Sequence, residues 1–325
     1  MSEQFLIEQL DEVVDAVVAG DAAVALPGAQ PELAELTTLV SELRLLPREN
    51  FKLTLKEALI RSSSMTSNAV ETSKTEPAHR LSIVPYLTVR GAEQLVDFVK
   101  QAFGANEMFR TTGSAGGMHA EVMIGDSKLM IGGYPDVEEK PAALHVYVPD
   151  ADAVYQRALE AGATSLEEPV DQFYGDREAG VKDPSGNVWW IATHKLGAAG
   201  TYAPAGMGSV TPSIPAVGAA GLIEFLQAAF DAEVVSRDES AAGVIQHATL
   251  RLSDSMLEIG EAHGIAQPIA PALYMYVADV DSSYENALRA GATSMQTPTD
   301  QAYGDRTAWV KDAWGNIWYL AAPIE

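Results

Sequence analysis

The sequence predicts an α+β protein with two tandem copies of one domain, because a long stretch of the chain occurs twice at constant spacing. Tyr174–Arg177 reads YGDR and returns as Tyr303–Arg306, and Gly186 returns as Gly315; both pairs are 129 residues apart. A period of this size indicates a duplicated domain and excludes solenoid repeats. Within each copy, apolar periodicity predicts the order strand, helix, strand, strand, strand, and this order occurs twice. Each copy is therefore expected to hold two βαβββ units.

The composition limits location and partners. The chain has 325 residues, a net charge of −24 and no cysteine. An acidic surface repels phosphate groups, so neither nucleic acid nor a membrane surface is an expected partner. The lack of cysteine excludes disulfides, thiolate metal sites and cysteine nucleophiles. The acidic N-terminus lacks the basic region of a signal peptide, and no apolar run is long enough for a membrane span, so a cytoplasmic location is predicted.

The chain is expected to divide into five parts. Apolar residues at spacings of three and four predict a helical segment over 1–61, and the polar stretch 62–80 is typical of a linker. The two copies then occupy 81–195 and 209–325, joined by a second linker at 196–208.

The first unit of the first copy is expected to begin with a strand over Ile83–Val89. Pro85 indicates that this strand begins near a sheet edge, because proline cannot donate to a ladder. A helix with one apolar face follows over Ala92–Phe103 and ends at Gly104. Three further strands are predicted near Glu107–Thr111, Met118–Ile124 and Lys128–Ile131.

The second unit repeats this order. A strand over Leu144–Val148 precedes a helix over Ala151–Ala161, which Asp150 is expected to cap. Its remaining strands are predicted near Ser165, Gly180–Lys182 and Val188–Ala192.

Several motifs together resemble one known family. AGAT after the second helix, YGDR, and DPSGN before the last strand, in a duplicated βαβββ pattern, are similar to the vicinal oxygen chelate superfamily, also called the glyoxalase/bleomycin resistance/dioxygenase superfamily. The HAEV…IGDS hairpin and the YGDR…DP.GN.W ending resemble its PhnB-like branch. The resemblance covers both copies but not residues 1–80. It implies two tandem glyoxalase-like domains in which paired βαβββ units form an open eight-stranded cup, after a small helical segment.

The resemblance also implies where a divalent metal would bind. Active members hold the ion through His, Glu or Gln side chains on the first and last strands of each unit. In the first copy these positions fall near Val84, Met130, Ala143 and Trp190, and in the second near Thr211, Glu258, Ala272 and Tyr319. Only Glu258 is a good ligand, so no metal and no cofactor are predicted. A register slip of two residues would bring His145 to the place of Ala143.

The histidines have competing interpretations. His119 with Glu121 faces one side of its strand and can act as a base or metal site, or as an ordinary hydrogen-bonded pair; His247 is equivalent to His119, but Thr249 replaces Glu121. His145 is expected to face the cup. His79, His194 and His263 are expected in exposed linkers or loops.

Aromatic residues gather on the strands that would line the cups. Adjacent Trp189 and Trp190 must point to opposite faces of one strand, so one lies in the core and the other in the cup. Aromatic walls suit flat or cationic organic ligands, although core packing explains any single ring as well. The predicted ligand-binding residues are Tyr86, Met130, His145, Tyr147, Trp190, Glu258, Tyr274, Tyr276 and Tyr319.

The predicted function is the binding of a small organic molecule without metal, as the resemblance to bleomycin-resistance members implies. Two alternatives remain open: a metal-dependent lyase, isomerase or dioxygenase, or a structural module with degenerate cups. The four units can pair within copies or between them, as in a fused pseudo-dimer. Exchanged pairing is favoured because single-domain relatives commonly dimerise, and it alone places Glu258 opposite His145.

Overall fold

The computed structural model describes residues 83–112, 117–196 and 200–324, which fall in one compact unit of the chain. The predicted helical segment 1–61 and the linker 62–80 lie outside the described residues. No helix in the described part of the chain is both long and apolar enough to cross a membrane.

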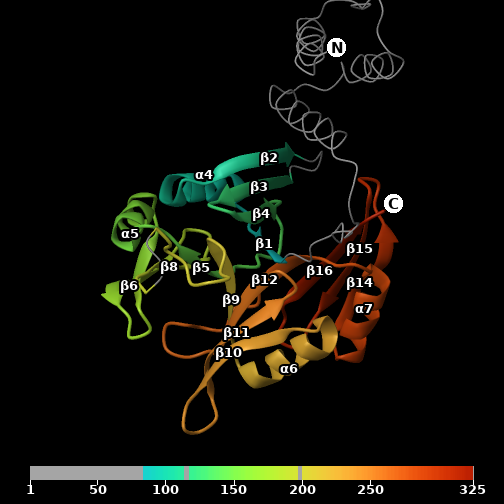
Figure 1. Cartoon of the computed structure of the whole chain (residues 1–325). Helices are drawn as coiled ribbons and strands as arrows, with labels where there is room; N and C mark the ends of the chain where they lie inside the picture. Colours follow the sequence, from blue (N-terminus) through green and yellow to red (C-terminus); the bar gives the residue numbers. More distant parts are fainter. Residues whose placement is uncertain (1–82, 113–116, 197–199, 325) are drawn as a thin grey trace, which may run out of the picture. The chain divides into compact units, whose positions relative to one another are not determined.

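Four βαβββ units follow one another along the chain (Figure 1). Unit 1 comprises β1 (Ile83–Thr88), α4 (Ala92–Phe103), β2 (Asn106–Thr112), β3 (Met118–Ile124) and β4 (Ser127–Gly133). Unit 2 comprises β5 (Ala143–Tyr147), α5 (Ala151–Glu160), β6 (Thr164–Asp171), β7 (Asp176–Lys182) and β8 (Val188–His194). Unit 3 comprises β9 (Val210–Ala216), α6 (Ala219–Phe230), β10 (Glu233–Glu239), β11 (Ile245–Leu252) and β12 (Ser255–Glu261). Unit 4 comprises β13 (Ala272–Tyr276), α7 (Val280–Arg289), β14 (Thr293–Asp300), β15 (Asp305–Lys311) and β16 (Ile317–Pro323).

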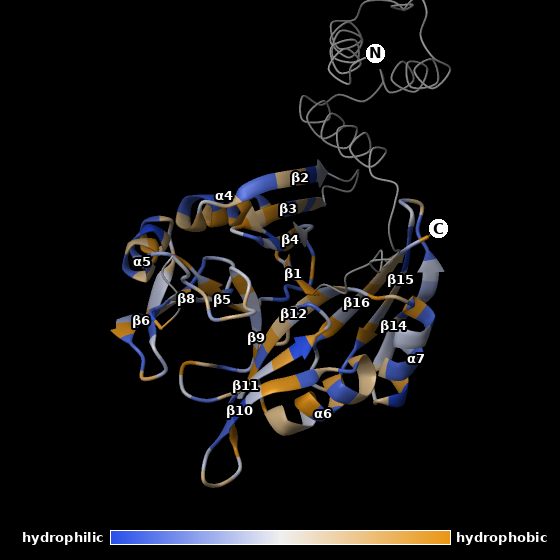
Figure 2. Ribbon diagram, viewed as in Figure 1, coloured by the Kyte–Doolittle hydropathy of each residue, from blue (hydrophilic) through white to orange (hydrophobic). Residues whose placement is uncertain are grey.

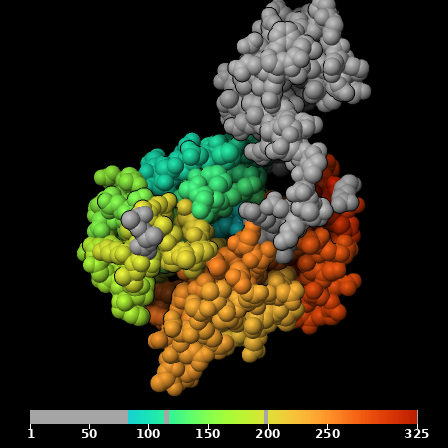
Figure 3. Space-filling model, viewed as in Figure 1, coloured from blue at the N-terminus to red at the C-terminus, as the bar shows by residue number. Residues whose placement is uncertain are grey.

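The units pair between copies, not within them. Units 4 and 1 form one eight-stranded sheet in the order β14-β15-β16-β13-β1-β4-β3-β2, and units 3 and 2 form the other, β10-β11-β12-β9-β5-β8-β7-β6. At the two joints, Val84 pairs with Tyr274 and His145 pairs with Thr211, both in antiparallel ladders. The two copies therefore lie against each other, as Figure 3 shows. The exchanged pairing expected from the sequence is confirmed.

The apolar cores, in contrast, each lie almost entirely within one copy. Helix α4 packs on α5, and α6 packs on α7 (Figure 1). One core cluster runs from Leu87 to Val210 and the other from Ile214 to Leu320. Helix α6 carries six of these buried residues, and Figure 2 shows its hydrophobic colouring. The helices of one copy thus pack on each other, whereas each sheet contains strands from both copies.

The IGDS hairpin of unit 1 ties the two sheets together. The Asp126 carboxylate accepts a hydrogen bond from the backbone N–H of Ser209 at 2.7 Å, and the Ser127 hydroxyl accepts one from Val210 at 3.0 Å. The matching hairpin of unit 3 does the same, since the Ser255 hydroxyl accepts from the backbone of Ile83 at 2.9 Å. The two serines thus bond to the first residues of β9 and β1, the strands that begin units 3 and 1.

The DPSGN turn is part of the core as well as a turn. The buried Asp183 carboxylate accepts hydrogen bonds from the Asn187 amide at 2.8 Å and from the Trp189 indole at 2.9 Å. Asp312 makes the same bonds in the second copy, to Asn316 and Trp318. Burial raises the pKa of both aspartates, but these donors oppose that effect.

Two local expectations are wrong. Strand β1 is central in its sheet, not near an edge; Pro85 is tolerated because the ladder to β13 ends there and the ladder to β4 begins at Tyr86. Strand β7 begins at Asp176, four residues before the predicted Gly180. Its first residues are charged, so they show no apolar alternation in the sequence.

Candidate functional site

The candidate sites lie on the sheet faces that turn away from the helices, and we call these faces cups. Along each strand, residues in the helix-side core alternate with residues that face the cup. The tyrosine cup, from units 1 and 4, contains the predicted residues Tyr86, Met130, Tyr274, Tyr276 and Tyr319. The histidine cup, from units 2 and 3, contains the predicted residues His145, Tyr147, Trp190 and Glu258.

Aromatic rings in mutual contact cover the tyrosine cup. The ring of Tyr319 lies 5.5 Å from that of Tyr86, 6.3 Å from that of Tyr274 in a stacked arrangement, and 5.2 Å from Trp309 edge-to-face. Tyr276 contacts Tyr274 at 5.1 Å. Such contacts orient the rings, so the cup presents a fixed aromatic surface.

One side of the tyrosine cup is polar. Nδ1 of His119 lies 3.3 Å from the Tyr86 hydroxyl, and Lys128 donates to Glu121 at 2.9 Å. His119 also lies 3.9 Å from Glu121. The nearby imidazole of His119 and the Lys128 ammonium lower the pKa of Glu121 to about 2. The predicted His119–Glu121 pair thus includes a third residue, Lys128, which contacts Glu121.

In the tyrosine cup, the metal positions that the resemblance implied do not suit an ion. The four positions that the resemblance implied are occupied in this sheet by Val84, Met130, Ala272 and Tyr319. Burial raises the pKa of Tyr319 to about 12, so its phenol stays protonated and is a poor ligand. No other of the four offers a nitrogen or oxygen side-chain donor.

In the histidine cup, His145 lies between two carboxylates from different elements. Its Nδ1 lies 3.1 Å from Glu258 on β12, and its Nε2 lies 3.2 Å from Glu178 on β7. Glu258 is only 4% exposed, so it faces the cup and the predicted strand register is correct. The Glu–His pair that depended on exchanged pairing is therefore present.

The pKa values of the buried pair shift toward the charged forms when no other cation is bound. Burial alone favours neutral side chains, but Glu258 and Glu178 outweigh it and raise the pKa of His145. In the same way, His145 and His247 outweigh the effect of burial and lower the pKa of Glu258. A buried carboxylate without such donors would instead have a raised pKa.

Further side chains support this pair. The Tyr174 hydroxyl donates to Glu178 at 3.2 Å, His194 lies 2.5 Å from Asp176, and His247 lies 3.6 Å from Glu258. The Tyr147 ring stacks on the imidazole of His145 at 4.5 Å. Glu178 and Glu258 thus each have a second partner besides His145, and Asp176 is paired with His194.

Trp189 and Trp190 divide as expected. Trp189 is fully buried in the helix-side core, while the Trp190 ring lies over Gly180 on the cup side. A Cβ at Gly180 would come within 2.6 Å of that ring, so the strand needs glycine there.

Sequence reasoning missed Asp176 and Glu178. Both follow Gly175 of the YGDR motif, and because they are two residues apart they face one side of β7. This spacing could have indicated a pair of carboxylates on one face, but the predicted strand began only at Gly180, after both residues. The expectation that His194 is loop-exposed is wrong, because it ends β8 and bonds to Asp176. His263 is exposed as predicted, and His79 lies outside the described residues.

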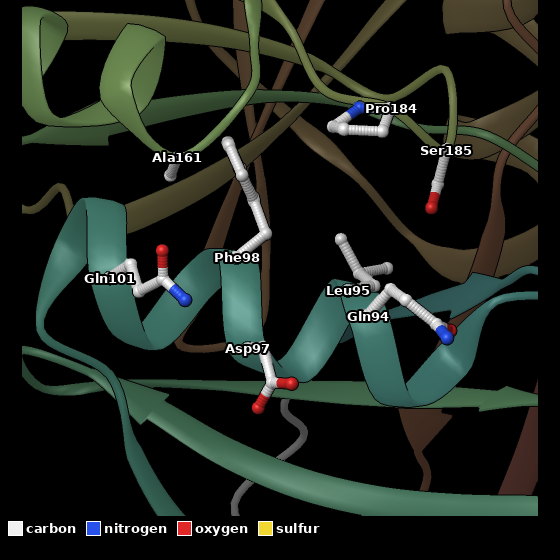
Figure 4. A pocket seen from close by; sticks show the side chains of 8 residues that line it. All are labelled: Gln94, Leu95, Asp97, Phe98, Gln101, Ala161, Pro184 and Ser185. Atoms are coloured by element: carbon white, nitrogen blue, oxygen red, sulfur yellow. The ribbon is translucent and has the colours of Figure 1, made fainter.

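A pocket of ≈ 280 Å³ lies on the helix side, away from both cups (Figure 4). It is lined by residues of α4 and by three residues of unit 2, namely Gln94, Leu95, Asp97, Phe98, Gln101, Ala161, Pro184 and Ser185. It contains none of the predicted ligand-binding residues.

Comparisons with known proteins agree with this geometry. The family model described as the Glyoxalase/Bleomycin resistance protein/Dioxygenase superfamily matches residues 79–191 and 214–320. An uncharacterized protein of Mycobacterium bovis is 37% identical over 129 residues, which cover 35% of this chain and 81% of that protein.

Solved structures show the same fold. Glyoxalase I from Zea mays has a TM-score of 0.56 at 14% identity, with 74% of this chain and 92% of that chain covered. A putative dioxygenase from Bacillus subtilis has a TM-score of 0.52 at 11% identity, with 75% and 86% covered. With both copies matched by one family model, the chain belongs to the glyoxalase/bleomycin resistance protein/dioxygenase superfamily.

Proposed function

We propose that the protein binds a small, flat organic molecule in the tyrosine cup without the help of a metal ion. The observation that carries this proposal is the set of rings centred on Tyr319, which contacts Tyr86, Tyr274 and Trp309. Flat ligands gain both apolar burial and ring stacking on such a surface. The Tyr86 hydroxyl and the charged pair Glu121–Lys128 supply polar groups at one side that can orient the ligand.

Family membership supports this class of function. This superfamily includes bleomycin resistance proteins. Binding without metal agrees with the tyrosine cup, whose implied ligand positions hold no strong donor set. Cationic ligands also suit the phenol faces through cation–π attraction.

The histidine cup favours the second candidate, metal-dependent chemistry. It brings together three histidines and three carboxylates from two units, with His145 and Glu258 buried at its centre. Acid–base and metal-assisted reactions both need such donors.

Fluorescence tests the tyrosine-cup proposal. Trp309 is 36% exposed and contacts Tyr319, so a ligand on these rings should quench its emission. The probes are bleomycin and a panel of planar aromatic amines, added to protein treated with a chelator. At least one probe should bind saturably, and Tyr319→Leu should weaken it about tenfold by removing one stacked ring.

Trp190→Leu is the matched variant, because Trp190 occupies the corresponding place in the histidine cup. It should leave the affinity for the probe unchanged. If no probe quenches, or if Trp190→Leu loses binding while Tyr319→Leu keeps it, the proposal is wrong.

A further inference from the structure

The histidine cup contains a buried nitrogen without a hydrogen bond. His145 is 9% exposed, and its Nε2 has no hydrogen-bond partner among the described residues. Glu178 lies 3.2 Å from this nitrogen, within ion-pair distance, but the alignment falls short of a hydrogen bond. A buried polar atom left in this way is costly unless something else binds it.

The carboxylates of Asp176 and Glu178 lie beside this nitrogen. One ligand atom from each of His145, Asp176 and Glu178 can be chosen so that all three lie within 4.8 Å of one another. Asp176 and Glu178 reach the same face because they are two residues apart on β7. Strand β8 lies between β5 and β7, and the ring of its residue Trp190 lies over Gly180.

Each of the three side chains is oriented by its own neighbour. Glu258 lies 3.1 Å from Nδ1 of His145, Tyr174 donates to Glu178, and His194 bonds to Asp176. Metal-binding histidines almost always donate their other ring N–H to a carboxylate or carbonyl, and ligating carboxylates are held in the same way. Glu258 fits this supporting role.

We propose that His145, Asp176 and Glu178 bind one divalent first-row transition metal ion, with Glu258 as a positioning residue for His145. This site is independent of the function proposed for the tyrosine cup. It also differs from the positions that the family resemblance implied, because in the histidine cup those are Thr211, Glu258, Ala143 and Trp190. The donors lie instead on the first and third strands of unit 2. One imidazole nitrogen with two carboxylates suits Mn²⁺ to Zn²⁺ better than Ca²⁺ or Mg²⁺, which prefer oxygen ligands alone.

Zn²⁺ titration by calorimetry tests the site, with the full chain lacking any added histidine tag and stripped of metal by a chelator. One equivalent of Zn²⁺ should bind. Asp176→Asn and Glu178→Gln should each weaken binding at least tenfold, and Glu258→Gln should weaken it about 10- to 100-fold, the range seen for supporting residues. Asp305→Asn is the matched control, because Asp305 holds the place of Asp176 in unit 4, where Thr307 replaces Glu178. It should bind Zn²⁺ like the wild type.

Nitrogen NMR of ¹⁵N-histidine-labelled protein gives a readout that a purely structural role would not move. Zn²⁺ should shift the ¹⁵N resonance of Nε2 in one histidine, and this resonance should be missing in His145→Gln. Nδ1 of the same ring should stay protonated, with its proton directed toward Glu258. The proposal is overturned if wild-type protein binds no Zn²⁺, if Asp176→Asn and Glu178→Gln retain wild-type affinity, or if Zn²⁺ shifts Nδ1 instead. Aromatic-probe binding is measured separately, so failure here leaves the tyrosine-cup test unaffected.

Discussion

The two cups are built from the same arrangement of strands, but their side chains differ at nearly every position. The corresponding pairs, histidine cup first, are Ser213 and Tyr86, His145 and Tyr274, Glu178 and Thr307, Trp190 and Tyr319, and Glu258 and Met130. The histidine cup has buried ionisable groups at its centre, whereas the tyrosine cup has phenol rings there and its ion pair Glu121–Lys128 at one side. The strand pairing, the hairpin contacts and the aspartate turns are nevertheless the same in both halves. The difference indicates that duplication kept the framework and allowed the two binding faces to diverge.

Exchanged pairing determines what each face can contain. Units 2 and 3 come from different copies, so His145 and Glu258 meet although they are 113 residues apart. Pairing within copies would have placed Glu258 beside Tyr274 and Tyr319. A buried carboxylate near phenols has no cation to offset its desolvation.

Removing the carboxylate should have the largest effect. Glu258→Met introduces the residue found at the corresponding place in the tyrosine cup and leaves His145 buried with one carboxylate partner fewer. It should lower the free energy of unfolding by about 3–5 kcal/mol, the usual cost of breaking a buried ion pair. Urea unfolding followed by circular dichroism measures this.

Met130→Leu is the matched control, since it changes the tyrosine cup without adding or removing charge. It should cost less than about 1.5 kcal/mol. A loss of unfolding free energy below about 1 kcal/mol in Glu258→Met would show that the His145–Glu258 pair stabilises the fold no more than the neutral residues at the corresponding places in the tyrosine cup.

The shared framework should respond equally in both halves. Asp183→Asn and Asp312→Asn each weaken the acceptor for one buried indole and one amide, so each should cost about 1–3 kcal/mol of unfolding free energy. The test compares the two values by urea unfolding. If one variant is clearly destabilised and the other is neutral, the framework has diverged as well, which would contradict the comparison.

The smallest expected effect is the dependence of stability on pH that Glu121 contributes in the tyrosine cup. The folded-state pKa of Glu121 is lowered to about 2 from 4.5, so its ionised form stabilises the fold fully above pH 4.5 and loses this effect as the pH falls through 2. Glu121→Gln should therefore lower the melting temperature at pH 7, and the gap to wild type should shrink at pH 3.

Thr249→Ser changes the residue at the matching place in the histidine cup and carries no charge. Its gap to wild type should not follow this pH course. A gap for Glu121→Gln that stays constant from pH 7 to pH 3 would show that Glu121 is not held as an ion.

Much of the fold followed from the sequence because its signals are periodic. The helix at Ala92–Phe103 was predicted at its observed bounds, since its apolar face and Gly104 mark both its orientation and its end. The repeat spacing gave two copies of two units, and the position of Glu258 on the cup face followed from strand alternation.

The site was harder to predict because its buried residues are charged. Asp176 and Glu178 were not among the predicted site residues, because the partners that allow their burial reach them only through the tertiary fold, as His145 and Tyr174 do for Glu178. The prediction that Pro85 lies near a sheet edge was wrong for a related reason, because the change of strand partner at that residue is not visible in the sequence. The local sequence likewise does not distinguish the two pairing modes, because β1, β5, β9 and β13 hold equivalent places in their units.

The central claim is that each cup joins side chains from both copies, and a double-mutant cycle on His145 and Glu258 tests it most directly. The cycle compares the unfolding free energies of His145→Gln, Glu258→Gln and the double variant with the wild type. Close buried charges should show a coupling energy of about 1.5 kcal/mol or more. A coupling below about 0.5 kcal/mol, as for residues that do not touch, would contradict the exchanged assembly of the histidine cup.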